Sequence, residues 1–213
     1  MASQENTTRA SRVYIPRSFC PAHVMNPIEI VAAVFGVISV FLSVRQNIWS
    51  WPTAIVNVGL YVFVFYESKL YADTGLQVIY VVLNAYGWYH WLYGGKNRTE
   101  LPVSRTSPRL GAFLVGLGLA GTALIGTLLA QKTDAALPYM DAMTTSTSLV
   151  AQWMMTRKLL ENWIVWVSVD VIYIGMYIYK SLYVTAALYL VFLILSAMGY
   201  FQWRASLRER TAP

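Results

Sequence analysis

Seven apolar segments separated by short polar loops constrain this chain more than any other feature. They are residues 28–44, 51–66, 76–93, 110–130, 139–156, 163–179 and 186–203. A helix needs about 20 mainly apolar residues, within a range of about 17–25, to cross the roughly 30 Å hydrocarbon core of a bilayer. Only 12% of the residues are charged, whereas soluble domains average about 25%. The sequence therefore predicts an all-α integral membrane protein with seven transmembrane helices.

The basic residues indicate membrane topology and not nucleic-acid binding, although the net charge is +6. Lys and Arg cluster in the short loops, where an excess marks the cytoplasmic side. Ten of the 16 fall on one side and six on the other, which predicts the N-terminus outside and the C-terminus in the cytoplasm. Residues 1–26 are polar and lack the apolar core of a signal peptide. Cys20 is the single cysteine, so no intrachain disulfide is expected.

The chain repeats itself without gaps after 112 residues. Matching pairs include Arg45 with Arg157, Trp51 with Trp163, Tyr61 with Tyr173, Gly87 with Gly199 and Trp91 with Trp203. Three spans per copy is an odd number, so the fourth span is needed to give both copies the same orientation. This 3+1+3 parallel repeat is typical of transporters whose site lies between two halves. The predicted divisions are a tail (1–26), the first repeat (27–95), the linker and fourth span (96–135), the second repeat (136–204) and a C-terminal tail (205–213).

The sixth span carries an acid inside an apolar segment. Trp163, Trp166, Asp170, Tyr173 and Tyr177 are spaced three, four, three and four apart, so they share one helix face. A carboxylate in a membrane span costs about 2.5–3.5 kcal/mol on insertion scales and normally faces a bundle interior or a wet cavity. The acid flanked by aromatic rings predicts a binding site for a flat, polar organic molecule.

Two other spans carry polar faces. The third has a stripe of Gln77, Tyr80, Asn84, Trp88 and Trp91, and the matching face of the seventh reads Tyr189, Phe192, Ser196, Tyr200 and Trp203. A symmetric scaffold with such unequal chemistry favours an asymmetric ligand. The fifth span aligns Asp141, Thr145, Ser148 and Gln152, for which ordinary helix-to-helix bonding is at least as good an interpretation.

The sequence does not support catalysis. Gly116-x-Gly118-x-x-Gly121 matches the dinucleotide fingerprint, but that motif needs a strand before it and a helix after it, and here it lies within a span. His90 near a span end fits an interfacial position. We find no metal-ligand cluster, no nucleophile beside a base and no phosphate-binding loop, so we expect neither an enzyme nor a bound cofactor or metal.

Three segments resemble the PnuC family of bacterial nicotinamide riboside transporters: QNIWSWPTAIVNVGLY (46–61), LYADTGLQVIYVVLNAYGWYHW (70–91) and ENWIVWVSVDVIYIGMY (161–177). The resemblance implies a SWEET-like fold with full-length duplication, a homotrimer and the inner membrane. It also implies facilitated diffusion of the riboside, which a cytoplasmic kinase of NAD biosynthesis would trap by phosphorylation.

Site residues are implied by the same resemblance. The family's Trp-x-x-Trp-x-x-x-Asp stripe falls on Trp163, Trp166 and Asp170, its third-span amides on Gln77 and Asn84, and further polar positions on Asn57 and Asn162. Trp51, Tyr80, Trp88 and Tyr173 complete the expected substrate site. Thiamine, riboflavin or a sugar remain alternative substrates, and a seven-helix receptor or structural protein without transport remains the alternative of another class.

Overall fold

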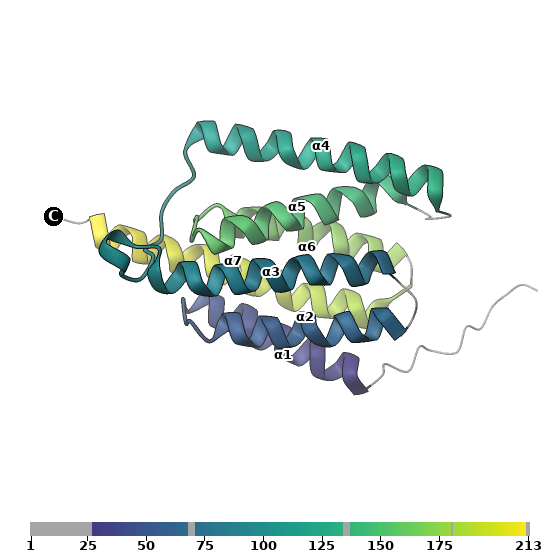
Figure 1. The fold of residues 1–213 in the computed structure, drawn as a ribbon, viewed down its shortest axis with the longest axis horizontal. Coiled ribbons are helices and arrows are strands. Elements are labelled where there is room, and N and C mark those ends of the chain that lie inside the picture. The colour runs from purple at the N-terminus through teal and green to yellow at the C-terminus, as the bar shows by residue number, and fades with distance from the viewer. Residues whose placement is uncertain (1–26, 68–70, 134–136, 180, 212–213) are drawn as a thin grey trace, which may run out of the picture.

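The computed structural model describes residues 27–67, 71–133, 137–179 and 181–211, and within them the chain forms seven α-helices (Figure 1). The predicted all-α fold is confirmed, and the predicted tail 1–26 lies outside the described residues. The helices are α1 (Pro27–Val44), α2 (Ser50–Glu67), α3 (Tyr71–Tyr93), α4 (Pro108–Lys132), α5 (Pro138–Thr156), α6 (Asn162–Tyr179) and α7 (Tyr183–Thr211).

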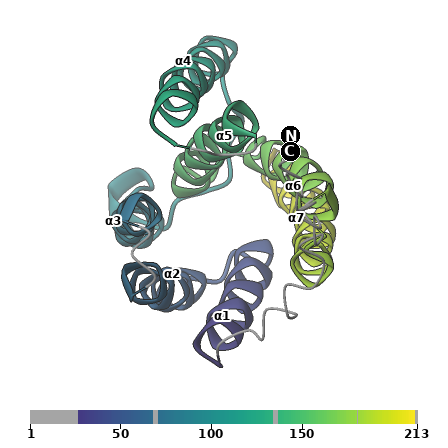
Figure 2. The ribbon, with the colours of Figure 1, turned by 90° about the vertical axis from the view of Figure 1, so that its right-hand side faces the viewer.

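Six helices form a closed ring, and α4 stands outside it (Figure 2). Around the ring, α1 packs on α2, α2 on α3, α3 on α5, α5 on α6, α6 on α7, and α7 returns to α1. The fourth helix packs against α5. The first triplet of helices is therefore joined to the second at two places, α3 with α5 and α7 with α1.

The helix starts follow local sequence signals. Proline is the first residue of α1, α4 and α5, where its missing N–H breaks no helical bond. Ser107 caps α4 by accepting the backbone N–H of Leu110. At the other end of the chain, α7 continues to Thr211, so the helix runs past residue 204, the predicted end of the second repeat. Ala, Leu, Arg and Glu in residues 204–210 are good helix formers, which explains the continuation past the predicted division.

By length and hydropathy, α1, α4, α6 and α7 qualify as membrane spans. Helices α3 and α5 carry many polar and tyrosine residues, several of which line the cavity described below. Apolar length alone therefore understates the number of spans when a helix lines a polar interior.

The repeat is visible in the backbone. Helices α2 and α6 have the same length and start 112 residues apart. The turns before them match as well: Gln46 has φ 55° and its counterpart Lys158 has φ 48°. The N–H of Gln46 bonds to Ser43 O, and the N–H of Lys158 bonds to Met155 O, both at 3.0 Å.

Four tryptophans close one end of the ring, and we call them the tryptophan seal: Trp51, Trp91, Trp163 and Trp203. All are at most 2% exposed. Trp51 meets Trp91 edge-on at 5.1 Å and Trp163 meets Trp203 edge-on at 5.3 Å, both with an interplanar angle of 88°. Trp91 and Trp203 then contact each other at 5.8 Å. The seal thus reproduces the twofold relation of the repeat.

Hydrogen bonds from the seal cross between the halves. Trp91 Nε1 donates to Met155 O near the end of α5, and Trp203 Nε1 donates to Ser43 O near the end of α1, each at 3.0 Å. Ser43 and Met155 are themselves 112 residues apart. Each half therefore holds the first helix of the other half through one indole.

The connector between α3 and α4 packs on the turn before α6. Ser104 forms an isolated β-bridge with Leu159 in this turn. The N–H of Ser104 donates to Lys158 O at 3.0 Å, and the N–H of Leu160 donates to Ser104 O at 2.9 Å. Glu161 accepts the N–H and the hydroxyl of Thr106, both at 2.7 Å. Lys158 is consequently 5% exposed, and its Nζ lies 4.3 Å from the ring centroid of Trp91.

Glycine at position 87 is required by the seal, which gives a first prediction. A methyl group there would overlap the Trp51 indole, whereas nothing lies within 4 Å of the same atom at Gly75 on the same helix. We expect Gly87→Ala to destabilise the protein by about 1–3 kcal/mol through overpacking. Gly75→Ala should be neutral or slightly stabilising, because alanine is the better helix former. Thermal unfolding of both purified variants in detergent measures this, and equal melting temperatures would contradict it.

The buried lysine gives a second prediction. Burial lowers the pKa of Lys158 from 10.5 to about 8. Between these values the unfolded chain keeps the proton that the folded protein has lost, so this group adds stability as the pH rises. Below pH 8 both states are charged, and the folded state bears the cost of burying the ammonium.

Lys158→Gln introduces the residue that stands at the matching position of the first half, Gln46. We expect the Tm of this variant to fall relative to that of wild type as the pH rises from 8 to 10. Comparing the two proteins at each pH removes the contribution of other titrating groups. Lys132→Gln, at an exposed position on α4, is the matched control and should show no such trend. A Tm difference between Lys158→Gln and wild type that does not change with pH would contradict this prediction.

Candidate functional site

A cavity of about 490 Å³ lies inside the ring and is lined by all six ring helices. Its lining runs from Ser50, the first residue of α2, to Phe65 near the other end of that helix. Trp51 and Trp163 of the tryptophan seal form its floor. Toward the opposite end the lining residues, such as Phe65 and Thr185, are only half-buried. The cavity is therefore closed at the seal and reaches close to the other end of the bundle.

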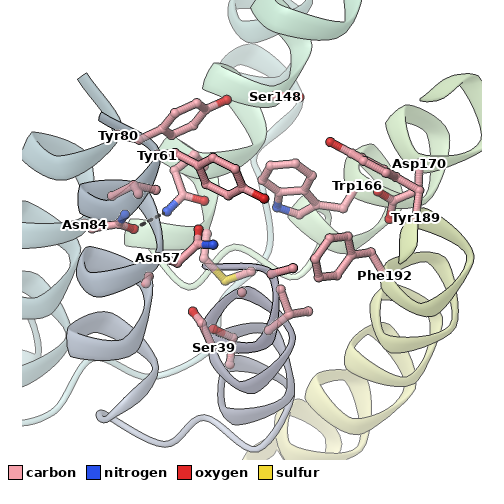
Figure 3. Close-up of a pocket in the computed structure, with 18 of the residues that line it drawn as sticks. Ser39, Asn57, Tyr61, Tyr80, Asn84, Ser148, Trp166, Asp170, Tyr189 and Phe192 are labelled. Carbon is pink, nitrogen blue, oxygen red and sulfur yellow. Dashed lines mark hydrogen bonds between the residues drawn. The ribbon is translucent and has the colours of Figure 1, made fainter. Parts of the chain in front are cut away.

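The structure brings most of the predicted site residues together. The following line the cavity: Trp51, Asn57, Gln77, Tyr80, Asn84, Trp163, Trp166, Asp170 and Tyr173. They come from α2, α3 and α6, so the helical spacing of the polar stripes correctly indicated their inward faces. Figure 3 shows how several of them point into the same space.

Trp88 and Asn162 do not line the cavity, which corrects the expectation for both. Trp88 follows Gly87, which touches the floor residue Trp51, so it lies at a level where the cavity is already closed; it is 39% exposed. Asn162 is fully buried and donates its amide to Leu159 O, in the turn behind the floor. Spacing along a helix finds the face but not the depth at which a cavity ends.

Asp170 is held on one wall with a single neutral partner. Its Oδ2 accepts the hydroxyl of Ser196 on α7 at 3.1 Å. The carboxylate is 3% exposed, and among the described residues the structure records no ion pair for it. A buried carboxylate without a cation is unfavourable, so this wall is suited to a positively charged ligand.

Amide side chains occupy the opposite wall. Gln152 Nε2 on α5 donates to Asn84 Oδ1 on α3 at 2.7 Å (dashed line in Figure 3). Asn57 donates to Ala32 O at 2.6 Å, and Gly36 leaves the room that this amide needs, since a Cβ there would lie 3.1 Å from Asn57 Nδ2. In the view of Figure 3, Asn57 and Asn84 lie to one side of Trp166, and Asp170 lies to the other.

Aromatic rings form much of the remaining wall. Trp166 points into the cavity from α6, and Tyr61 does so from α2 (Figure 3). Beyond them Tyr173, Tyr177 and Tyr189 form a cluster with centroid distances of 4.7 to 5.8 Å. These faces are suited to stacking a flat ring and, for Trp166, to cation–π attraction of about 0.5–2 kcal/mol.

Several lining residues were not among the predicted site residues. Tyr61, Gln152, Tyr189, Phe192 and Ser196 all line the cavity. The polar face of residues 139–156 already contained Gln152, but its spacing could not distinguish a cavity wall from a helix contact. Ser196 appeared to be a weaker copy of Asn84 until the fold placed it against Asp170.

The lining of the cavity offers groups for binding a ligand. Within the described residues, no group of three His, Cys, Asp or Glu side chains is placed to hold a metal ion. The lining contains one acid, several amides and hydroxyls, and many aromatic rings. That combination is suited to a flat, polar, cationic molecule, which it could hold by charge, stacking and hydrogen bonds.

Comparison with known proteins identifies the family of the chain. Residues 26–205 match the nicotinamide mononucleotide transporter family. The chain is 28% identical over 209 residues to the nicotinamide riboside transporter PnuC of Escherichia coli K12, covering 86% of this chain and 87% of that protein. It is 23% identical over 188 residues to the riboflavin/roseoflavin transporter RibM of Streptomyces davaonensis, covering 87% and 88%.

A solved structure is similar as well. A crystal structure of the vitamin B3 transporter PnuC superposes with a TM-score of 0.69 at 25% identity, covering 86% of this chain and 83% of that one. The match to the family spans nearly all of the described helices. The chain belongs to the nicotinamide mononucleotide transporter family, and it is therefore a multi-pass membrane transporter and not an enzyme.

Proposed function

We propose that this protein transports nicotinamide riboside across the membrane. The observation that carries the proposal is Asp170, a buried carboxylate in the cavity wall with no cationic side chain among the described lining residues. Nicotinamide riboside brings a flat pyridinium ring whose positive charge would offset that carboxylate. The rings of Trp166 and Tyr61 would stack on it, and the wall amides would bond the carboxamide and ribose hydroxyls.

The charge of the cavity favours the riboside over its phosphorylated form. Among the described lining residues there is no Lys, Arg or His. A phosphate is normally held by Arg, Lys or the N-terminus of a helix, and near Asp170 its negative charge would be repelled. The nucleoside is therefore the substrate of the proposal, although the family is named for the mononucleotide.

Transport by alternating access follows from the two halves. The tryptophan seal closes one end of the cavity, and rocking of α1–α3 against α5–α7 would open it while closing the other end. With the N-terminus outside, as the loop charges predict, the seal faces the cytoplasm of a bacterial inner membrane. A second hollow of about 310 Å³, lined by Trp91 and Lys158, lies beyond the seal and would receive the substrate.

No coupling ion is needed in this proposal. Asp170 is the one acid in the described lining of the cavity, and proton-coupled carriers use chains of such groups. Facilitated diffusion would then fill the cell only to the outside concentration, and phosphorylation by a cytoplasmic riboside kinase would trap the product. A homotrimer stays a prediction; α4, outside the ring with exposed Phe113 and Leu119, has an apolar face toward lipid or a neighbouring copy.

The relatives keep an alternative open. RibM carries a flavin according to its name, and the aromatic walls would also accept a neutral flavin or, with Asp170, cationic thiamine. A sugar or a protein without transport activity is favoured by no observation in the structure. Transport experiments should therefore compare nicotinamide riboside with riboflavin and thiamine.

Uptake into proteoliposomes tests the proposal directly. We expect labelled nicotinamide riboside to accumulate inside to the outer concentration, without any ion gradient, and excess unlabelled riboside to compete. The mononucleotide, thiamine and riboflavin should compete at least tenfold less well. Uptake no faster than in protein-free liposomes would reject transport of this substrate, and uptake that requires an ion gradient would reject facilitated diffusion.

Two substitutions test the site. Trp166→Ala should weaken riboside binding at least tenfold, about 1.4 kcal/mol, by removing the stacking wall. Asp170→Asn should do the same by removing the charge while keeping the shape. Calorimetry in detergent measures both, and Phe113→Ala, at a 65% exposed aromatic residue of α4 outside the ring, is the control that should bind normally. Normal binding by both site variants would exclude this wall from recognition.

A further inference from the structure

We propose that Asn84 and Gln152 form a carboxamide-recognition pair that selects substrates with a primary amide on the ring. This inference rests on the proposed function, and it names the chemical group of the substrate that the pair would bind. The polar face of residues 139–156 includes Gln152, but its pairing with Asn84 does not follow from the pattern of any single helix, because the residues lie 68 positions apart.

The hydrogen bond between the two amides determines what they offer to a ligand. Gln152 Nε2 donates to Asn84 Oδ1 at 2.7 Å, so Asn84 keeps its amide N–H groups and Gln152 keeps its carbonyl oxygen. An amide presents both a donor group and an acceptor. Turning both side chains over exchanges the roles and again leaves one donor and one acceptor. The pair therefore has this complement in either orientation.

The remaining donor and acceptor have no partner among the described residues of the protein and belong to residues in the wall of the cavity. Both residues line it, and within the described part of the chain no further hydrogen bond is recorded for either side chain. Asn84 is 2% exposed, so bulk water has little access to this donor. A ligand that leaves buried polar groups of this kind unpaired is disfavoured.

A primary carboxamide is complementary to this pair. Its carbonyl accepts from Asn84 Nδ2, and its N–H donates to Gln152 Oε1. A carboxylate offers only acceptors, so one of its oxygens would face the Gln152 carbonyl without a proton between them. The pair therefore distinguishes nicotinamide riboside from nicotinic acid riboside, which share the same ring and ribose.

The repeat does not reproduce the Asn84–Gln152 pair in its other half. The counterpart of Gln152 in the first half is Val40, and the counterpart of Asn84 is Ser196, which bonds to Asp170 instead. One wall thus carries two amides and the other an acid with a hydroxyl. A flat ring between them would have its charge toward Asp170 and its carboxamide toward the pair.

The test measures the dissociation constants of both ribosides for the purified full-length protein by calorimetry. We expect wild type to bind nicotinamide riboside at least tenfold more tightly than nicotinic acid riboside. Gln152→Met removes the acceptor, so binding of the amide should fall at least tenfold and the ratio should approach one. Gln131→Met, the same change at an exposed position on α4, should keep the wild-type constants.

A second variant changes the ratio in the other direction and preserves side-chain size. In Gln152→Glu the carboxylate takes the donor of Asn84, which leaves two acceptors toward the ligand. Binding of the amide should weaken, and the acid should bind still more weakly, so the preference is kept or widened. This variant carries the test if Gln152→Met does not yield a monodisperse protein.

The outcomes separate the two proposals. A wild-type ratio near one, or an unchanged ratio in both Gln152 variants, would overturn the carboxamide pair while riboside binding itself stands. Wild-type protein that binds neither riboside would overturn the proposed function and this inference with it. A ratio that narrows with Met and does not narrow with Glu supports the pair.

Discussion

The hydrogen bonds of the tryptophan seal are the interaction on which the rest of the structure depends. Trp91 and Trp203 each donate to a carbonyl on the opposite half. Apolar side chains gain little by leaving lipid for a helix contact, so association in a membrane relies on close packing and on such bonds. Glycines 87 and 199 allow that packing, because a side chain at either would overlap the neighbouring indole. The seal therefore closes the ring at one end and gives the cavity its floor.

A symmetric scaffold here carries an asymmetric site. The seal, the turns before α2 and α6 and the equal lengths of those two helices follow the 112-residue relation. The polar wall residues do not: Asp170 has Val58 as its counterpart, Trp166 has Ala54, and Gln152 has Val40. The duplicated parts support packing and the exchange between two states, whereas the unmatched parts provide the chemistry. An asymmetric ligand needs this division, since equal halves would offer it the same groups twice.

Charge is distributed unequally on the two sides of the seal. The cavity holds an acid with a neutral partner, and Lys158 lies on the other side of Trp91. The connector from α3 to α4 buries that lysine, whereas its counterpart Gln46 is half-buried. The connector thus makes the turn before α6 chemically different from the matching turn before α2. The unmatched wall residues make the two sides of the cavity different in the same way.

Much of the fold was predictable from the sequence because its signals are local. The division of the sequence into seven apolar segments predicted the seven helices of the described residues, proline marked three helix starts, and helical spacing predicted that Asn84, Trp166 and Asp170 face inward. The repeat could be read from matched residues alone. Only the tertiary structure decided which polar groups meet: Gln152 reaches Asn84 across 68 positions and Trp203 reaches Ser43 across 160. It also placed the floor, and so excluded Trp88 and Asn162, because the depth of a cavity depends on how helices pack and not on the period of any one of them.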